Sequence, residues 1–187
     1  MKQSWKPGNL LYPLPVIMLS CAEENQTPNI ITLAWTGTVC SEPPLLSVSV
    51  RKDRFSHGII SRSGEFVVNL VPASLSRACD TCGVKSGRDM NKFKELGLTA
   101  EKAPNLSQAP LIAESPVNLE CRVERVLELG SHDMFIARIV GVQVNEELLD
   151  ETGKMDLRKA DLIAYSHGEY FRLGEKVGSF GYSVRKA

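Results

Sequence analysis

Short apolar runs separated by turn-forming residues predict that this chain is built mainly from short strands. A nearly continuous apolar run at Pro15–Ala22 indicates one buried strand, and Phe66–Leu70 indicates another. Asn29–Trp35 and Leu45–Arg51 also have strand composition, and a turn-rich connector containing Pro43–Pro44 joins them. Because proline cannot donate a ladder hydrogen bond, we expect the connector to end one strand before the next begins.

The second half of the chain has the pattern of a long hairpin. Residues Val117–Glu124 alternate apolar and polar side chains, which is the period of a half-buried strand. Gly130–Asp133 is expected to make the turn, and the largely apolar segment Met134–Val144 is the expected partner strand. Another short strand is expected around Leu162–Tyr165, followed by the segment Gly168–Leu173.

Helical patterns are few and short. Arg54–Arg62 is expected to form a short helical turn, Ser74–Phe93 has a polar helical pattern, and Gly97–Pro116 is rich in loop-forming residues. Many short strands with scattered helices favour a mainly β fold, a closed β-barrel with helical additions, over a doubly wound sheet. The length and the absence of repeats or long linkers predict a single domain over residues 1–187.

Composition excludes several classes of protein. Lysine plus arginine equals aspartate plus glutamate at 22 each, so no basic excess points to nucleic acid or to an anionic membrane. The same balance offers little charge repulsion against a dimer. The apolar run from Leu10 is broken by Pro13 and Pro15 and is too short to span a bilayer, so we expect a cytoplasmic protein. Five cysteines, an odd number, indicate reduced thiols.

Two segments suggest a site for an anion. At the far end of the strand Asn29–Trp35 lie small and hydroxyl residues, which are Thr32, Ala34, Thr36, Gly37 and Thr38. The second strand ends in the cationic run Arg51–Arg54, followed by Ser56 and His57. If the two strands are neighbours, hydroxyls, backbone N–H groups and positive charge converge as a phosphate requires. The alternative is an ordinary solvated strand end beside a threonine-rich strand.

Other familiar motifs receive less support. The pair Cys79-x-x-Cys82 lacks the βαβ context of a redox pair and the second pair of a zinc site, so two thiols in a helical turn are favoured. His57, His132 and His167 show no clustered ligand spacing, which argues against a metal site. The chain also lacks the glycine-rich Rossmann and P-loop motifs and the G-x-S-x-G nucleophile motif.

Several motifs agree in order and spacing with a known family. They are N-I-I-T-L-A-W-T-G-T-V-C-S-E-P-P, S-V-R-K-D-R-F-S-H, E-F-V-V-N-L, C-D-T-C-G-V-K-S-G-R-D-M-N-K-F, A-P-L-I-A-E-S-P-V-N-L-E-C and S-H-D-M-F-I-A-R. Over nearly its whole length the chain resembles the flavin reductase-like, FMN-binding split-barrel family, and most closely its flavoredoxin-type branch. The resemblance implies a six-stranded Greek-key split barrel and a homodimer that binds FMN.

The resemblance also implies a set of residues near the flavin. The implied cofactor-binding residues are Thr32, Leu33, Ala34, Trp35, Thr36, Ser49, Val50, Arg51, Ser56, His57, Cys82, Gly83, Ser86 and Lys92. Within this set, the side chains of Thr32, Thr36, Ser56 and Lys92 are expected around the ribityl phosphate. Backbone groups near Ala34–Trp35 and Ser49–Arg51 are expected at the polar edge of the ring.

Some of the implied roles have ordinary structural alternatives. Cys40 is expected near the isoalloxazine ring, or is simply a small buried hydrophobe. His132 either lies at the flavin edge, where it would donate a hydrogen bond or position a nicotinamide, or faces solvent in a turn. His57 either binds a phosphate or flavin oxygen or caps a turn. Trp35 and the tail aromatics Tyr165, Tyr170 and Phe171 could be core, dimer interface or a shield for the flavin.

Three functions stay open from the sequence. In the first, NAD(P)H reduces the flavin, and electrons pass to free flavin, a metal complex or another acceptor. In the second, tightly bound FMN acts as a flavoredoxin-type electron carrier between protein partners, without NAD(P)H oxidation. In the third, the barrel uses its pocket for something other than flavin. The chain has no nicotinamide-binding motif that decides among them.

Overall fold

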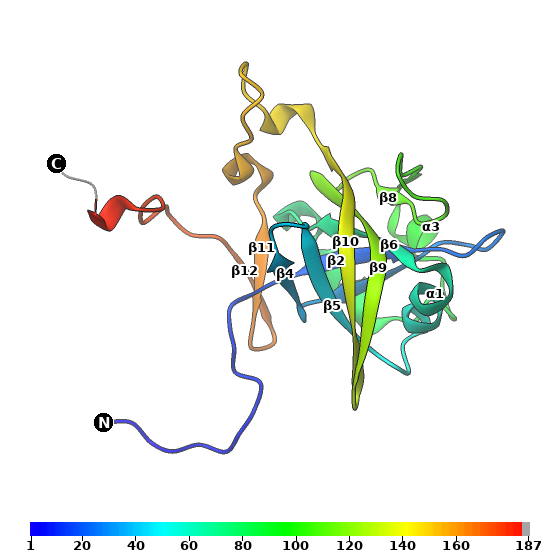
Figure 1. Ribbon diagram of the computed structural model, residues 1–187, viewed down its shortest axis with the longest axis horizontal. Coiled ribbons are helices and arrows are strands. Elements are labelled where there is room, and N and C mark those ends of the chain that lie inside the picture. Colours follow the sequence, from blue (N-terminus) through cyan, green and yellow to red (C-terminus); the bar gives the residue numbers. More distant parts are fainter. Residues whose placement is uncertain (185–187) are drawn as a thin grey trace.

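The body of the protein is a seven-stranded sheet in which each neighbouring pair of strands is antiparallel (Figure 1). The structure is a computed structural model that describes residues 1–184, so the last three residues of the predicted domain lie outside the described part. In spatial order the strands are β3 (Asn29–Leu33), β2 (Ile17–Cys21), β6 (Glu65–Leu70), β9 (Val117–Leu129), β10 (His132–Val144), β5 (Leu45–Arg51) and β4 (Thr36–Cys40).

Smaller elements surround this sheet. A three-stranded sheet is formed by β1 (Leu14–Pro15), β11 (Ile163–Ser166) and β12 (Glu169–Arg172), and a two-stranded one by β7 (Ala100–Glu101) and β8 (Leu111–Ile112). The α-helices are α1 (Phe55–Ser63), α2 (Ser76–Val84) and α3 (Lys92–Leu96), and the 3-10 helices are Ala73–Leu75, Glu146–Leu148, Leu157–Ala160 and Tyr182–Val184.

One passage of chain closes the large sheet. Strands β3 and β4 follow each other with only Ala34 and Trp35 between them, yet β3 pairs with β2 and β4 pairs with β5 at the opposite edge. The backbone N–H of Ser49 donates to the Trp35 carbonyl at 2.8 Å, which ties the link to β5. The two edges therefore meet, and the predicted mainly β barrel with helical additions is confirmed. Counting β3 and β4 as one interrupted strand gives six.

Three details of the sequence-based prediction were wrong. The segment 36–40 is not part of a connector but forms β4, because the turn occupies only residues 41–44. Asn29–Trp35 and Leu45–Arg51 are not ladder neighbours, since β3 and β5 lie apart in the sheet order and meet only near the link. In the β9–β10 hairpin the turn is Gly130–Ser131, and residues 132–133 already belong to β10.

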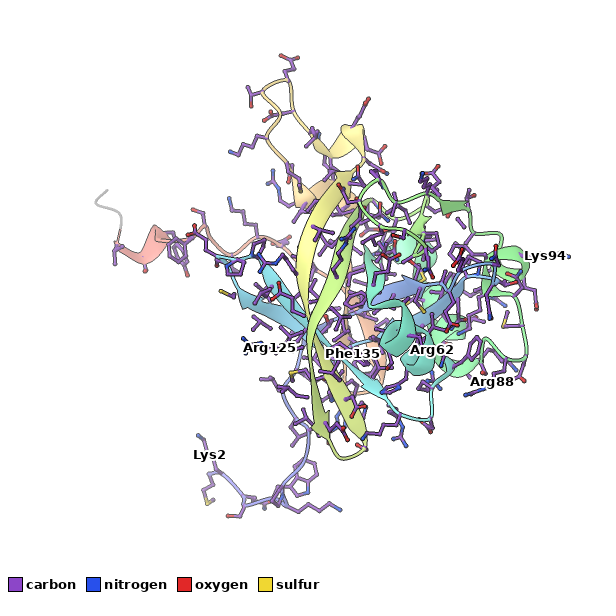
Figure 2. All side chains as sticks on the ribbon, turned by 45° about the vertical axis from the view of Figure 1, so that its right-hand side comes forward. Lys2, Arg62, Arg88, Lys94, Arg125 and Phe135 are labelled. Carbon is purple, nitrogen blue, oxygen red and sulfur yellow. The ribbon has the colours of Figure 1, made fainter. Side chains whose placement is uncertain are left out.

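Two apolar layers hold these elements. Alternate residues of β2, β5, β6 and β10 point into the barrel, where Phe66 and Phe135 are fully buried and Ile59 and Ile60 of α1 pack against them. Phe135 is labelled in Figure 2. On the other face of β2 and β3, Met18 and Ile30 pack against α2, α3 and β11. β2 is buried on both faces, which explains its continuous apolar sequence.

Segments at both ends of the chain lead away from the barrel. Residues 1–11 and the stretch after β12 extend on the same side of the molecule (Figure 1), and Lys2 lies far out on the first of them (Figure 2). Both expose large apolar side chains, among them Trp5, Leu11 and Val177. Within residues 1–184, no helix has the length and apolar character that crossing a membrane requires.

A buried polar network joins the strands behind the barrel. Asn69 on β6 is fully buried, and its Nδ2 donates to the Met18 carbonyl and to Ser20 Oγ, each at 2.9 Å. Its Oδ1 accepts from the Ile112 N–H at 3.0 Å and from Asn118 Nδ2 at 2.8 Å. One carboxamide thus links β2, β6, β8 and β9 with both of its polar atoms satisfied.

We expect Asn69→Ala to destabilise the protein by about 2–4 kcal/mol, because it leaves buried donors and acceptors on several strands without partners. Urea denaturation monitored by circular dichroism measures the effect. Gln3→Ala, which removes a carboxamide from the exposed N-terminal arm, is the matched control. Equal stability of the two variants would contradict this role for Asn69.

Candidate functional site

A cleft opens where the barrel closes. This central cleft has a volume of about 230 Å³ and is lined by Thr32–Trp35, by Ser49 and Arg51 of β5, and by His132 of β10. The alternation of β5 places Val48 and Val50 in the barrel and leaves Ser49 and Arg51 on the face that lines the cleft. The other walls are Val16, Ile31, Arg54, Gly83, Tyr165 and Tyr170.

A smaller cationic pocket adjoins the central cleft and shares Ile31 and Arg54 with it. Its volume is about 130 Å³, and its lining contains the four cationic residues Arg54, Lys85, Arg88 and Lys92 against one acidic residue, Asp53. Within residues 1–184, none of these four cations forms an ion pair with a carboxylate. The pocket therefore carries an excess of uncompensated positive charge.

The start of α1 adds further donors to the cationic pocket. Phe55 and Ser56 line the pocket in the first turn of this helix, which has no side-chain cap and no acidic residue in that turn. The first N–H groups of a helix lack intrahelical partners and carry the positive end of its dipole. Ser56 itself is buried and accepts a hydrogen bond from Asn29 Nδ2 at 2.8 Å. Together these features make an anion-binding pocket.

Three side chains fix the end of α2 against the two clefts. Arg54 donates to the Gly83 carbonyl, and Thr32 Oγ1 donates to the Cys79 carbonyl. Lys92 Nζ donates to the Cys82 carbonyl at 2.8 Å and to the Ile30 carbonyl at 2.6 Å. The last carbonyls of a helix lack intrahelical partners, and Lys92 and Arg54 satisfy two of them, those of Cys82 and Gly83. Gly83 is thereby held in the wall of the central cleft.

Lys92 is an unusual lysine. It is 2% exposed, and burial lowers its pKa, as does the nearby Arg54 cation, against an opposing effect of Cys82. Its ammonium group contacts only carbonyl oxygens in its two hydrogen bonds. An anion in the cationic pocket would stabilise the charged form of Lys92, so its burial is consistent with a binding role.

His132 and Trp35 stand together at the mouth of the central cleft. Their rings are stacked, with centroids 6.3 Å apart and planes 18° from parallel. Ser131 Oγ lies 2.9 Å from His132 Nδ1, which orients the imidazole. Trp35 also lines a third, more apolar cleft of about 280 Å³ under the N-terminal arm, which we call the arm cleft. The stacked pair thus provides a flat wall between two hollows.

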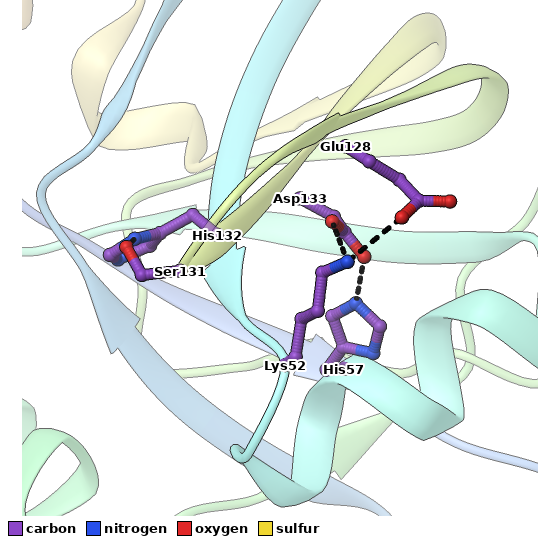
Figure 3. A network of polar contacts seen from close by, with 6 residues as sticks. All are labelled: Lys52, His57, Glu128, Ser131, His132 and Asp133. Carbon is purple, nitrogen blue, oxygen red and sulfur yellow. Dashed lines mark hydrogen bonds and ion pairs between the residues drawn. The ribbon is translucent and has the colours of Figure 1, made fainter.

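On the opposite side of β10, a charged network secures the same strand end (Figure 3). Asp133 is largely buried, and its carboxylate lies 2.8 Å from His57 Nε2 and 3.2 Å from Lys52 Nζ. Lys52 Nζ also lies 2.9 Å from Glu128. Burial works to raise the pKa of Asp133, but hydrogen bonds from His57 and Lys52 outweigh it and lower that pKa. The network joins α1 to the strand that carries His132.

Comparison with known proteins identifies the family. A flavin reductase like domain model matches residues 10–174. The chain belongs to the flavin reductase-like family. An uncharacterised protein of Archaeoglobus fulgidus is 32% identical over 161 residues, which cover 86% of this chain and 88% of the relative.

Solved structures agree with this assignment. The flavoredoxin of Desulfovibrio vulgaris (Miyazaki F) superposes with a TM-score of 0.91 and 30% identity, covering 99% of this chain and 100% of that one. An FMN-binding protein from Thermus thermophilus has a TM-score of 0.78 and 25% identity, covering 96% of this chain and 97% of that one. This flavin reductase-like chain therefore has the fold of a flavoprotein.

The structure brings most of the sequence-predicted residues of this flavin reductase-like chain together. Thr32, Leu33, Ala34, Trp35, Ser49, Arg51, Gly83 and His132 line the central cleft. Ser56, Ser86 and Lys92 line the cationic pocket, and Thr36 lines the arm cleft. The hydroxyl segment and the cationic segment lie close together, as expected from the sequence. They meet where the barrel closes, however, and not as two neighbouring strands of a ladder.

Four predicted residues lie elsewhere. The side chains of Val50 and Cys82 are buried in the apolar layers, and Cys82 borders the site through its carbonyl, the acceptor for Lys92. His57 faces Asp133 and the edge of Phe135, so it supports the site from behind. Cys40 lies on β4 with its Sγ 3.3 Å from the Glu42 carbonyl, and it lines none of these three clefts.

The cysteines of the C-x-x-C motif lie in surroundings that keep their thiols protonated. Cys79 and Cys82 are buried on α2, and burial raises their pKa values to about 12 and about 11. Thiolates are the reactive form of cysteine, so these two side chains stay unreactive at neutral pH. Within residues 1–184 no group of acidic, histidine or cysteine side chains is arranged to hold a metal ion.

Sequence reasoning missed several lining residues. Arg54 belonged to the recognised cationic run but was not assigned to the site, and Arg88 lay in a quoted motif without a role. Asn29 and Lys85 likewise lay in the quoted motifs without a role, because their place depends on how the loop after α2 folds onto β3. Tyr165 and Tyr170 were left open among core, interface and shield, and they prove to line the central cleft.

We expect Asp133→Asn to lower the melting temperature at about pH 7, because the carboxylate that His57 and Lys52 stabilise is lost. The stabilisation from a depressed carboxyl pKa is present above the unfolded-state value, about 3.9, and is lost as the pH falls through the folded-state pKa. The difference from the wild type should therefore shrink in acid. Thermal unfolding across this range measures it, with the exposed Glu151→Gln as control. A difference independent of pH would contradict the charged network.

Proposed function

We propose that the protein binds FMN and acts as an NAD(P)H-dependent oxidoreductase that passes electrons to free flavin, a metal complex or a protein acceptor. One observation carries the proposal: a flat-walled cleft for a planar ring adjoins a small pocket whose four cations form no ion pair with a carboxylate of residues 1–184. A ring system joined to a phosphate by a short polar chain matches this pair of hollows in shape and charge. The FMN-binding relative from Thermus thermophilus supports the same choice of cofactor.

The residues present fit the cofactor. Arg54, Lys92, Ser56 and Ser86 would hold the phosphate, aided by the uncapped start of α1. Thr32 lines the central cleft and follows Ile31, which both hollows share, so it would face the ribityl chain. Trp35, Tyr165 and Tyr170 would exclude water from the ring. Bound FMN supplies one- and two-electron transfer chemistry, while the protein contributes binding, orientation and electrostatics. His132, held by Ser131 and Trp35, would donate a hydrogen bond at the ring edge.

The second candidate is an electron carrier. The flavoredoxin of Desulfovibrio vulgaris is similar over nearly the whole chain, which favours a flavin that stays bound while partner proteins exchange electrons with it. The half-exposed Trp35 at the cleft mouth would be accessible to such a partner. The two candidates differ in whether NAD(P)H itself reaches the flavin.

We further propose that two copies assemble around the site. The arm cleft is formed partly by the N-terminal arm, which exposes Trp5 and Leu11, and the strip after β12 exposes Val177. Apolar arms that leave the body on the same side would cover apolar surface on a second copy. The zero net charge of the chain offers little repulsion against this contact.

We expect Lys92→Ala to weaken FMN binding by about tenfold to a hundredfold, because a hydrogen bond to a charged group contributes about 1.5–3 kcal/mol. Riboflavin lacks the phosphate, so its affinity should change by less than about twofold. Flavin fluorescence titration measures both. Lys94→Ala, on the same helix but outside the clefts, is the matched control, and Arg54→Gln is a second test. Unchanged FMN binding in both site variants would remove the cationic pocket from the proposal.

Anaerobic mixing of the FMN-loaded protein with NADH or NADPH separates the two candidates. Direct access of the nicotinamide to the central cleft predicts loss of the visible flavin band within seconds, on the order of typical turnover times. Persistence of the band with both nucleotides, together with bleaching by dithionite, would instead favour the electron carrier. A protein that takes up no flavin would contradict both.

A further inference from the structure

Asn29 is a buried carboxamide in the wall of the cationic pocket. It is the first residue of β3 and is 4% exposed. It lines both the cationic pocket and a neighbouring hollow of about 410 Å³, which we call the outer groove. Burying a polar side chain costs free energy unless its hydrogen bonds are made, so the partners of Asn29 indicate what this carboxamide holds in place.

The amino end of the carboxamide holds the first turn of α1. Asn29 Nδ2 donates to Ser56 Oγ at 2.8 Å, and Ser56 is 1% exposed. Arg54, the residue before the helix, makes no side-chain cap. A usual cap is an acceptor that occupies the first N–H groups of a helix. Because Nδ2 is a donor, Asn29 fixes this turn without occupying those groups, which stay available for an anion.

The same hydrogen bond decides how the Ser56 hydroxyl acts. Its oxygen accepts from Asn29, so its own proton is free to be donated to another group. One group within hydrogen-bonding distance is the thiol of Cys21, which lies opposite Asn29 in the β2–β3 ladder. Burial raises the pKa of Cys21 to about 12, so the thiol stays neutral and is a weak acceptor. An anion in the pocket that Ser56 lines is a stronger acceptor and would receive the proton.

The carbonyl end of Asn29 lies against the loop after α2. A Cβ on Gly87 would come within 2.1 Å of Asn29 Oδ1 and 2.8 Å of Phe55 Cδ1. Only glycine lets the backbone of the loop lie directly on these two side chains. Lys85 and Ser86, which line the cationic pocket, come directly before Gly87. Asn29 therefore contacts two walls of the pocket, the start of α1 and the loop after α2.

We propose that Asn29 is a positioning residue of the cationic pocket, which fixes these two walls relative to each other and orients the Ser56 hydroxyl as a donor to the flavin phosphate. The inference rests on the proposed function, because it takes the phosphate of FMN as the anion. Asn29 acts through Ser56 and does not line the central cleft. Its contribution therefore concerns the phosphate and not the ring.

Titration of the flavin-free protein with FMN and with riboflavin, followed by flavin fluorescence, tests the proposal. We expect Asn29→Ala to weaken FMN binding by about tenfold and riboflavin binding by less than about twofold. Asn29→Asp, which keeps the shape of the side chain, should weaken FMN binding by about a hundredfold, because a carboxylate would accept the Ser56 proton and repel the phosphate. Gln26→Ala removes an exposed carboxamide that lines the outer groove but neither of the other two hollows, and it should change neither affinity.

A double-mutant cycle with Ser56→Ala tests whether Asn29 acts through the hydroxyl. Substitutions of two residues in one hydrogen-bonded pair have effects that do not add. Adding Ser56→Ala to Asn29→Ala should therefore weaken FMN binding by less than a further factor of about two. Thermal unfolding verifies that each variant is folded, and Asn29→Asp replaces Asn29→Ala in the cycle if the alanine variant does not fold.

Three results would overturn the role of Asn29. They are an unchanged FMN affinity in Asn29→Ala, an equal loss of affinity for FMN and riboflavin, and full multiplication of the two effects in the double variant. Failure of the proposed function has a different signature, because it concerns the wild type. The wild type would then bind neither flavin, or would bind FMN no more tightly than riboflavin.

Discussion

The whole arrangement depends on how the barrel is closed. A single passage of chain pairs with β2, crosses at Ala34 and Trp35, and then pairs with β5 at the other edge of the same sheet. Residues at such a crossing cannot take part in both ladders, and here Ala34 is buried while Trp35 exposes its side chain. The Ser49 to Trp35 hydrogen bond fixes the seam, and the central cleft lies along it. The crossing that closes the barrel is therefore also the place where the central cleft forms.

The strands next to this crossing are held in place by packing on the faces turned away from the central cleft. The strand ends that line the central cleft belong to β5 and β10, and their opposite faces are occupied by the barrel core and by the network of Asp133, His57 and Lys52. A ring lying at the seam would therefore meet walls that are already packed. Preorganisation of this kind reduces the ordering cost of binding.

The sequence revealed regular elements well because apolar periodicity reports burial directly. The hairpin of β9 and β10, the buried strand β2 and the strand β5 were all predicted, the last with its bounds. β4 was missed because glycine, threonine and exposed positions in T-G-T-V-C hide any alternation. The closure of the sheet was not predictable from periodicity, since it depends on which distant edge the chain joins after Trp35.

In the site, too, some residues could be predicted from the sequence and others only from the structure. Hydroxyl and cationic residues could be recognised by type, and the family resemblance supplied Gly83, Ser86 and Lys92, which line the clefts. By contrast, His57 and Cys40 are near the site in sequence but point elsewhere, because side chains on α1 and β4 follow the helical and strand periods and not the ligand. The place of Arg88 was recognised only once the loop after α2 was placed against Phe55.

The way α2 ends has a consequence for kinetics. Arg54 and Lys92 are held by neutral carbonyl dipoles and not by carboxylate counter-ions, so an entering anion has no internal ion pair to displace. When an anion binds, Arg54 and Lys92 gain a charged partner in addition to neutral carbonyls. When the anion leaves, the same carbonyl groups are still there to accept their hydrogen bonds. Association of an anion should therefore be fast and steered by long-range attraction, which weakens as ionic strength rises.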